Sequence, residues 1–206
     1  MRAYMWLGRA LIHVLGPIIR LFMRVHVVGK ENIPCEDIPL VLCCNHISNW
    51  DPIFLIVANP KRHVYFMAKA ELFANRLFTW FLGKQLGAFP VRRGSGDMSA
   101  IDTAKRLVNE RKLMGIFPEG TRSKDGNLLR PKSGAALIVA QTGASVLPAA
   151  VVTRGQRVRL FQRVTVAYGK PLSPEELHLT DSERPDIRYA TRLIMKRIAE
   201  LIETNG

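Results

Sequence analysis

Short apolar runs alternate with longer amphipathic segments from residue 25 onward, and this alternation constrains the fold more than any other feature of the chain. The runs are rich in β-branched residues, as buried strands are. The longer segments repeat apolar residues every three or four positions, as helices with one buried face do. Strands that alternate with helices favour an α/β fold: a single domain with a mainly parallel sheet flanked by helices.

The same pattern locates the individual elements. Strands are predicted over residues 25–28, 40–44, 64–68, 86–91, 113–117, 145–152 and 158–168. Helices are predicted over residues 52–58, 71–81, 98–111, 135–141 and 187–203. The helix over residues 135–141 is followed by Gly143, a residue that commonly ends helices. A chain of 206 residues suits one domain of this kind.

The chain carries 30 Lys and Arg residues against 17 Asp and Glu residues, a net charge of +13. Such an excess indicates an anionic partner: a membrane surface, a nucleic acid or a phosphorylated substrate. The basic residues are not gathered in an arm or a recognition helix, so no nucleic acid is expected. The three cysteines form no CxxC pair, and Cys43 and Cys44 are adjacent in an apolar run. Neither a zinc site nor a disulfide framework is expected, and a reducing cytoplasm suits this composition.

The first 24 residues form a basic, amphipathic segment. No acidic residue precedes Glu31, and the polar residues of the segment recur at intervals of seven and four. On a helix this spacing gathers them within a stripe of roughly 60° on an otherwise apolar surface. The stripe consists of Arg2, Arg9, His13, Arg20 and Arg24. A basic stripe on an apolar helix is typical of a segment that lies in a membrane interface.

Other interpretations of this segment stay open. A helix packed on the domain is one, although its polar face would ordinarily be wider. A spanning helix needs about 20 apolar residues, and the longest stretch free of arginine covers residues 10–19. A signal peptide would need a cleavage site of small residues, and none is evident before residue 25. We therefore divide the chain into a membrane-interface segment, residues 1–24, and a domain, residues 25–206, and expect Pro17 to kink or split the helix.

A histidine and an aspartate lie in the turn between a predicted strand and a predicted helix. Residues 45–51 read Asn-His-Ile-Ser-Asn-Trp-Asp and are followed by Pro52. A regular helix would separate His46 and Asp51 by roughly 140°, so they can meet only if the loop curls back. The carboxylate would then fix the imidazole tautomer and leave the other ring nitrogen as a base. Pro52 also makes Asp51 a natural N-cap, and the alternative is that Asp51 only caps while His46 only bonds within the loop.

Three further blocks follow this loop. Residues 87–93 read Gly-Ala-Phe-Pro-Val-Arg-Arg, residues 117–123 read Phe-Pro-Glu-Gly-Thr-Arg-Ser, and residues 146–150 read Val-Leu-Pro-Ala-Ala. Together with the Asn-His-x4-Asp loop, they resemble the four motifs of the glycerolipid acyltransferases of the 1-acylglycerol-3-phosphate acyltransferase family. The resemblance spans residues 45–150, and four blocks in order are far more specific than any one of them.

The resemblance implies roles for the matching residues. His46 would be the general base and Asp51 the group that orients it. In the family, the arginines of the second and third blocks are associated with the phosphate of the acceptor, and these positions fall on Arg93 and Arg122. The family usually has one arginine in the second block, so Arg92 makes that assignment ambiguous. Because the carboxyl ends of parallel strands meet at one edge, these residues are expected around one crevice.

Four more residues complete the expected site. Lys69 resembles a further basic contact of the family, although a lysine after a strand is otherwise simply solvated. Glu119 would either touch substrate or pair with an arginine and orient its turn. Gly120 and Thr121 belong to the same turn as Arg122, where exposed N–H groups can help the guanidinium to bind phosphate.

The activity that the resemblance implies is transfer of a fatty acyl group from an acyl thioester to the free hydroxyl of 1-acylglycerol-3-phosphate, giving phosphatidic acid in phospholipid synthesis. The donor would be acyl-CoA or acyl carrier protein, with no cofactor or metal and no acylated residue. Glycerol-3-phosphate or another lyso-lipid is the alternative acceptor. An inactive membrane scaffold would have less reason to keep both His46 and Asp51. The expected partners are the lysophospholipid, the thioester donor and a membrane surface. The expected location is the cell membrane, peripheral or monotopic on the cytoplasmic face.

Overall fold

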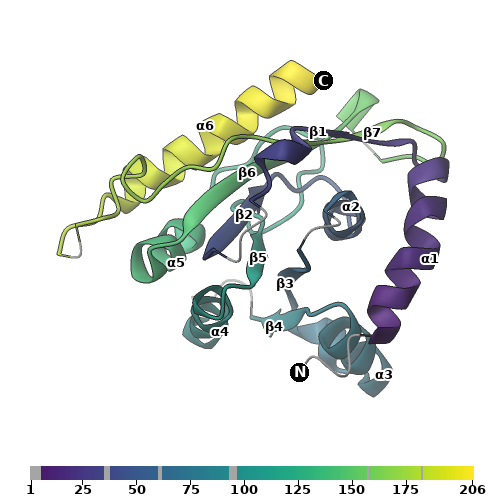
Figure 1. Cartoon of the computed structure of the whole chain (residues 1–206), viewed down its shortest axis with the longest axis horizontal. Helices are drawn as coiled ribbons and strands as arrows, with labels where there is room; N and C mark the ends of the chain where they lie inside the picture. The colour runs from purple at the N-terminus through teal and green to yellow at the C-terminus, as the bar shows by residue number, and fades with distance from the viewer. Residues whose placement is uncertain (1–5, 35–37, 60–61, 93–96, 157, 182) are drawn as a thin grey trace.

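The computed structural model describes residues 6–34, 38–59, 62–92, 97–156, 158–181 and 183–206, and within them a seven-stranded sheet forms the centre of the molecule (Figure 1). The strands are β1 (Val25–Val28), β2 (Leu40–Cys44), β3 (Val64–Lys69), β4 (Phe89–Val91), β5 (Leu113–Ile116), β6 (Ser145–Thr153) and β7 (Val164–Tyr168). Their order is β1-β7-β6-β2-β5-β3-β4, and every neighbouring pair is parallel except β6 and β7. The predicted α/β fold with a mainly parallel sheet is thereby confirmed.

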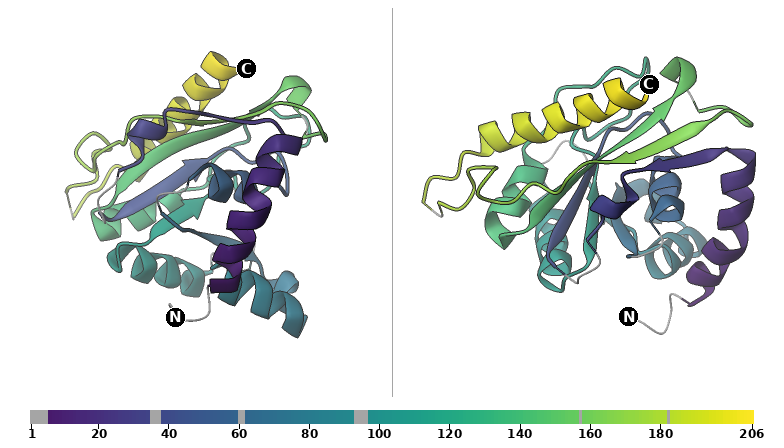
Figure 2. Two further views of the ribbon diagram at one scale, coloured as in Figure 1. Left: turned by 45° about the vertical axis from the view of Figure 1, so that its right-hand side comes forward. Right: turned by 45° about the horizontal axis from the view of Figure 1, so that its top comes forward.

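Helices cover both faces of this sheet (Figure 2). The α-helices are α1 (Trp6–Phe22), α2 (Asp51–Ala58), α3 (Arg76–Phe78), α4 (Met98–Asn109), α5 (Gly134–Thr142) and α6 (Ile187–Asn205). Shorter turns are η2 (Lys30–Asn32), η3 (Ala70–Phe73), the π-helical η4 (Thr79–Gln85) and η5 (Arg154–Gln156). Helices α4, α5 and α6 pack on one face, and α1 and α2 pack on the other.

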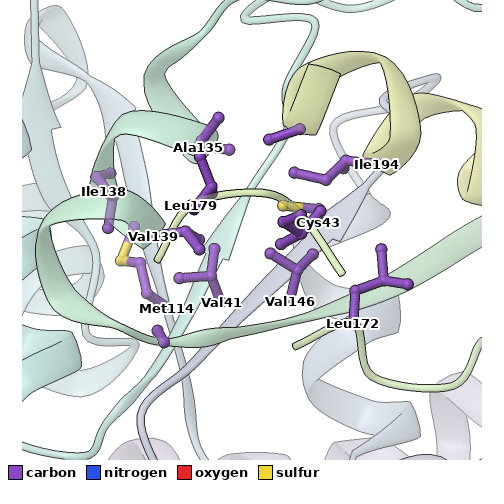
Figure 3. Close-up of a cluster of buried hydrophobic side chains, with 14 of the residues drawn as sticks. Val41, Cys43, Met114, Ala135, Ile138, Val139, Val146, Leu172, Leu179 and Ile194 are labelled. Atoms are coloured by element: carbon purple, nitrogen blue, oxygen red, sulfur yellow. The ribbon is translucent and has the colours of Figure 1, made fainter. Parts of the chain in front are cut away.

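Strand β2 is the middle of the hydrophobic core, and all five of its side chains are fully buried. Val41 and Cys43 join the cluster under α4, α5 and α6 (Figure 3), whereas Leu40, Leu42 and Cys44 join the cluster under α2. This division follows from the alternation of side chains along a strand. Burial raises the pKa of the Cys43 thiol to about 12 and also raises that of Cys44 well above its ordinary value.

The helix predicted over residues 71–81 is wrong, because the segment is broken into η3, α3 and η4. The Asn75 side chain accepts a hydrogen bond from the N–H of Leu77 at 2.8 Å, and the Thr79 hydroxyl donates to the carbonyl of Phe73 at 2.7 Å. Such local side-chain bonds compete with a regular helix ladder. The predicted apolar face is also partly exposed, with Leu72 48% and Leu77 69% accessible.

The strand predicted over residues 158–168 begins only at Val164. Its first part is instead a turn between β6 and β7, in which Phe161 adopts a left-handed conformation with φ 63°. Leu160 and Phe161 are 64% and 59% exposed there, so apolar composition alone did not indicate a buried strand. The other predicted strands and helices are confirmed with boundaries shifted by a few residues.

Helix α1 has three faces. One packs on the domain through Ile12, Ile19 and the adjoining Met23. A second is basic: His13 and Arg20 are exposed, and Arg20 donates through Nη2 to the carbonyl of Val57 at 2.7 Å. The third face is apolar and exposed, and we call it the outward face; it consists of Val14, Leu15, Ile18, Leu21 and Phe22.

Helix α1 continues through Pro17 as one element, so the predicted split does not occur. Of the predicted basic stripe, Arg2 lies outside the described residues. Within the described ranges, no helix combines the length and the apolar character that a bilayer-spanning segment requires.

Candidate active site

The loop after β2 is anchored by Asn45, whose side chain is 2% exposed. Its Nδ2 donates to the carbonyl of Val151 at 3.0 Å, and its Oδ1 accepts from the N–H of the same residue at 2.8 Å. The side chain thereby continues the pairing of β2 with β6 beyond the end of the strand. This role of Asn45 was not predicted, because the only sign of it in the sequence is the place of the residue in the first motif.

His46 and Asp51 do meet, because the loop curls back as predicted. The distance from His46 Nδ1 to Asp51 Oδ2 is 2.7 Å, and the Asp51 side chain is fully buried. The same carboxylate oxygen accepts from the N–H groups of Ile47 at 2.7 Å and Ser48 at 2.8 Å. An ionised carboxylate only accepts hydrogen bonds, so Nδ1 carries the imidazole proton. Nε2 is left without a partner in the described part of the chain and is free to act as a base.

The predicted N-cap role of Asp51 is wrong. Helix α2 begins at Asp51, and the residue before it, Trp50, has helical angles and makes no side-chain cap bond. The carboxylate points back to the loop because three donors converge on it there. On the helix side, Pro52 has no N–H to offer. The other carboxylate oxygen, Oδ1, is buried without a partner among the described residues.

Stacked aromatic rings fix the orientation of the His46 imidazole. Its ring lies against that of Phe117 with centroids 4.1 Å apart, and Phe117 stacks on Phe66 at 5.7 Å. Phe66 in turn lies over Gly115, where an added Cβ would come within 2.3 Å of the Phe66 ring. Only glycine leaves room for this arrangement, so Gly115 in β5 indirectly positions the base.

Glu119 binds the backbone of the loop. Its Oε1 accepts from the N–H of His46 at 2.8 Å and its Oε2 from the N–H of Leu129 at 2.9 Å. The side chain is 3% exposed, and this burial raises the pKa of its carboxyl. The N–H of Ser123 also donates to the carbonyl of His46 at 2.8 Å. Of the two predicted roles for Glu119, orientation of the turn therefore fits this geometry, although through backbone N–H groups in place of an arginine.

A cavity of about 440 Å³ opens beside His46. Its walls are mostly apolar residues of α4, α5 and β5, and its polar lining includes Arg92, Asp97, Gly120 and Lys132. Gly120 has φ 69° in the turn after β5, a conformation that favours glycine. Among the described residues, no group of three or more His, Cys, Asp or Glu side chains is placed to hold a metal ion.

Of the predicted cationic residues, Arg92 lines the cavity, whereas Lys69 and Arg122 do not. Lys69 ends β3 and is half exposed in an ion pair with Glu71 at 3.2 Å. Thr121 and Arg122 are exposed in the turn after β5, and Arg122 has no partner in the described part of the chain. Arg93 lies outside the described residues, so its predicted role stays a prediction.

The cavity residues Asp97 and Lys132 were not predicted from the sequence. The stem of Lys132 lies over Gly120, since a Cβ added there would be 3.0 Å from Lys132 Cδ. Asp97 caps α4, accepts from the N–H of Arg92 at 2.9 Å, and so holds the end of the second motif. Hydrogen bonds from the Ser99 hydroxyl and from this N–H lower the pKa of Asp97 to about 2. An aspartate just before a predicted helix weakly indicates an N-cap, so Asp97 could have been noticed. Nothing in the sequence distinguishes Lys132 from the other lysines.

The fold and the site define the class of the protein: an α/β enzyme in which a histidine is held by a buried carboxylate beside a mostly apolar cavity, a geometry that suits general-base chemistry. Residues 24–152 match the model of the family described as Acyltransferase. The chain therefore belongs to the acyltransferase family, and it is an enzyme of acyl transfer.

Two relatives and one solved structure show how far the likeness extends. The chain is 36% identical over 193 residues to the 1-acyl-sn-glycerol-3-phosphate acyltransferase of Bacillus subtilis (strain 168), covering 92% of this chain and 94% of the relative. It is 30% identical to the enzyme of that name from Streptococcus pneumoniae, over 78% of this chain and 60% of the relative. The crystal structure of the 1-acyl-sn-glycerophosphate acyltransferase of Thermotoga maritima superposes with a TM-score of 0.67 at 25% identity, covering 97% of this chain and 81% of that one.

Proposed function

We propose that the chain moves a fatty acyl group from acyl-CoA or acyl carrier protein to the free hydroxyl of 1-acylglycerol-3-phosphate, giving phosphatidic acid. The observation that carries the proposal is the 2.7 Å bond between His46 Nδ1 and Asp51 Oδ2 in a residue that lines the cavity. Nε2 has no partner among the residues that the structure describes. The names of the relatives from Bacillus subtilis and Streptococcus pneumoniae support the choice of acceptor.

In the proposed reaction His46 is the only group that moves a proton. Nε2 takes the proton of the acceptor hydroxyl as its oxygen attacks the thioester carbon, and Asp51 stabilises the resulting imidazolium. The C–S bond then breaks, the sulfur leaves as a thiolate, and His46 can return the proton to it. A thioester is already activated, so the enzyme supplies a base and correct placement and no covalent intermediate is required.

Placement of the two substrates follows from the surroundings of His46. The apolar walls of the 440 Å³ cavity suit the acyl chain of the donor or the acceptor. The phosphate of the acceptor would bind outside this cavity, where Arg122 and the N–H groups of its turn are exposed, with Lys69 and Arg93 as further cations. A phosphate held there would bring the hydroxyl to His46.

Purified protein offered a panel of acceptors with both donors tests this proposal, with products identified by lipid mass spectrometry. The panel contains 1-acylglycerol-3-phosphate, glycerol-3-phosphate and lyso-lipids with other head groups. Phosphatidic acid formed from 1-acylglycerol-3-phosphate, and absent with His46→Ala, is the expected result. Transfer to glycerol-3-phosphate alone, or to a neutral lyso-lipid alone, would contradict the choice of acceptor.

We further propose that the enzyme lies on the cytoplasmic surface of the cell membrane, with the outward face of α1 inserted among the acyl chains. An exposed apolar patch of this kind is typical of membrane contact. Phe161 extends the patch, because its ring lies 5.6 Å from that of Phe22 and its N–H donates to the Phe22 carbonyl. The exposed basic residues of α1, His13 and Arg20, would lie at the level of the phosphates.

The membrane proposal is tested by changing the outward face while keeping the packed face, because deletion of the whole segment would also remove Met23 from the core. The double variant Val14→Glu with Leu21→Glu should lose binding to vesicles and activity toward bilayer lipid, but keep activity toward a short-chain soluble acceptor. Arg192→Glu on α6 changes the net charge equally and should bind as wild type does. Equal losses in the two variants would reject insertion of α1.

A further inference from the structure

Lys132 connects the cavity beside His46 with the turn that carries Arg122. It lies in the segment just before α5, and its N–H donates to the carbonyl of Pro118 at 2.8 Å, which holds this segment against the turn. The side chain extends across Gly120 and lines the same cavity as His46. Lys132 is therefore placed between the proposed base and the turn proposed to bind phosphate.

The position of the Lys132 ammonium follows from its contact with Gly120. A Cβ added to Gly120 would be 3.0 Å from Cδ and Cε of Lys132 and 3.2 Å from its Nζ. Nζ is thus within about 5 Å of the Gly120 Cα, since a carbon–carbon bond adds about 1.5 Å. The next residue along the chain is Thr121, so a ligand bound to this ammonium can also reach the Thr121 N–H.

Several donors around Lys132 have no acceptor in the described part of the chain. They are its own ammonium, the N–H groups of Thr121 and Arg122, and the Arg122 guanidinium. All three residues are exposed, so a ligand can reach them. Lys69, by contrast, is already in an ion pair with Glu71 at 3.2 Å. Exposed donors with positive charge and no acceptor favour an anion with several oxygens.

The acidic residue in the cavity wall does not neutralise Lys132. Asp97 lines the cavity, but its Oδ1 accepts from the Ser99 hydroxyl at 2.6 Å and its Oδ2 from the N–H of Arg92 at 2.9 Å. The carboxylate of Glu119, in the turn itself, accepts from the two backbone N–H groups described above. The positive charge of Lys132 is thus left for a ligand.

We propose that Lys132 binds the phosphate of the acceptor, together with Arg122 and the N–H of Thr121. This assignment rests on the proposed function, in which 1-acylglycerol-3-phosphate is the acceptor. Its free hydroxyl and its phosphate are on adjacent carbons of the glycerol, so a hydroxyl bonded to His46 Nε2 leaves the phosphorus within about 8 Å of that nitrogen. Lys132 lines the cavity that His46 lines, whereas Lys69 does not, so Lys132 is the better placed lysine for this short span.

The phosphates of the donor are the other source of the same chemistry. In acyl-CoA and in acyl carrier protein, a long pantetheine arm separates the thioester from the nearest phosphate. When the thioester carbon is beside His46, these phosphates therefore lie far from the base. A cation in the wall of the cavity beside His46 fits the acceptor's phosphate better than the donor's.

Equilibrium binding tests the proposal without the reaction. Titration calorimetry of the full chain, in the absence of donor, compares 1-hexanoylglycerol-3-phosphate with 1-hexanoylglycerol, which lacks the phosphate. Lys132→Ala should weaken binding of the first compound by about 10- to 100-fold and leave binding of the second unchanged, because one charge-assisted contact is lost. Lys132→Arg keeps the charge and should recover part of the affinity. Equal losses for both compounds, or wild-type protein that does not distinguish them, would overturn the proposal.

Steady-state kinetics separates the two sources of phosphate. Lys132→Ala should raise the KM for 1-acylglycerol-3-phosphate by about 10- to 100-fold, with a smaller effect on kcat and none on the KM for the donor. A rise in the donor KM alone would assign Lys132 to the donor. A fall in kcat alone would assign it to the oxyanion of the transition state. Either result would overturn the proposal.

Lys124→Ala is the matched control, because it removes the same charge from an exposed lysine of the same loop that does not line the cavity. Its affinities and KM values should equal those of wild type. A loss as large as that of Lys132→Ala would show general attraction to charge and would overturn the proposal. If Lys132 governed binding of the phosphate compound although no phosphatidic acid were formed, the proposed function would fail while the phosphate site would stand.

Discussion

Two regions of the active-site edge differ in how their side chains are held. The inner side consists of His46 and the residues that bind it, and the rim consists of the exposed turn residues Thr121 and Arg122. On the inner side, both backbone groups of His46, its Nδ1 and both carboxylate oxygens of Glu119 are hydrogen-bonded within the protein. At the rim, Thr121 and Arg122 are exposed, and Arg122 has no partner in the described part of the chain. The proposed base is thus held by the protein itself, whereas the groups proposed to bind phosphate would gain their partners from the substrate. Substitutions inside should therefore affect rate and stability, and substitutions at the rim should affect the requirement for substrate.

His46→Ala is the strongest test of the inner side. Loss of the base should lower kcat by about 10²–10⁴-fold, measured with saturating acceptor and donor. Circular dichroism and vesicle binding should match wild type, because within the described residues the imidazole makes one hydrogen bond and one ring contact. A variant that turns over near the wild-type rate would remove His46 from the mechanism.

Asp51→Asn distinguishes a catalytic carboxylate from a structural one. The amide keeps one oxygen for the N–H groups of Ile47 and Ser48, but it removes the negative charge that stabilises the imidazolium. We expect kcat to fall by roughly 10²-fold. If turnover stayed constant while the melting temperature fell, Asp51 would only hold the loop.

Arg122→Ala tests the rim. The KM for 1-acylglycerol-3-phosphate should rise by about 10- to 100-fold, because one charge-assisted contact to phosphate is lost, while the KM for the thioester donor stays near wild type. Arg122→Lys should restore only part of the affinity for the acceptor, since an ammonium cannot make the planar two-point contact with phosphate. A parallel rise in both KM values would point to general damage instead.

Glu119→Gln should destabilise the inner side without touching the substrate. A glutamine can accept from only one of the two N–H groups that Glu119 binds, so the N–H of either His46 or Leu129 would face another donor. Leaving a buried donor unpaired costs about 1–3 kcal/mol, measurable by urea unfolding. The KM for acceptor should not change; a selective rise in it would mean that Glu119 contacts substrate.

Asp97→Ala gives the smallest expected effect and a pH dependence. Hydrogen bonds lower the pKa of Asp97 from 3.8 to about 2, so its stabilising contribution is present above pH 3.8 and is lost as the pH falls through 2. The melting temperature of the variant should be below wild type at pH 7, and the difference should narrow below pH 3.8. Asp97→Asn keeps a capping oxygen, so its melting temperature at pH 7 should fall less than that of Asp97→Ala. A difference that is constant with pH would exclude the charge as the cause.

The sequence was sufficient where a residue's role depends on its own neighbours in the chain. The buried strand before His46 was predicted from the local pattern, which also indicated that His46 and Asp51 could meet only if the loop curled back. The Asp51 cap failed because the upstream donors of the loop competed for the same carboxylate. The helix over residues 71–81 failed because Asn75 and Thr79 bond to nearby backbone, which a pattern of apolar residues does not record.

Roles that depend on distant segments could not be predicted from one sequence. Asn45 acts on Val151, and Glu119 acts on His46, across separations of 106 and 73 residues. Lys132 reaches Gly120 only because the segment before α5 returns to the turn after β5. The contact of Gly115 with Phe66 likewise exists only once β3 and β5 are paired. Such contacts require the fold itself.

The burial of Cys43 and Cys44 would favour the fidelity of the proposed reaction with a thioester donor. A thiolate near such a substrate can accept the acyl group itself, in a thiol–thioester exchange that would acylate the protein. Exchange requires an ionised and accessible sulfur. With its pKa raised to about 12 by burial, the Cys43 thiol stays protonated at pH 7. Both side chains are also fully buried, although they precede His46 by only a few residues. Strand β2, which leads to His46, would thus keep its own sulfurs from self-acylation.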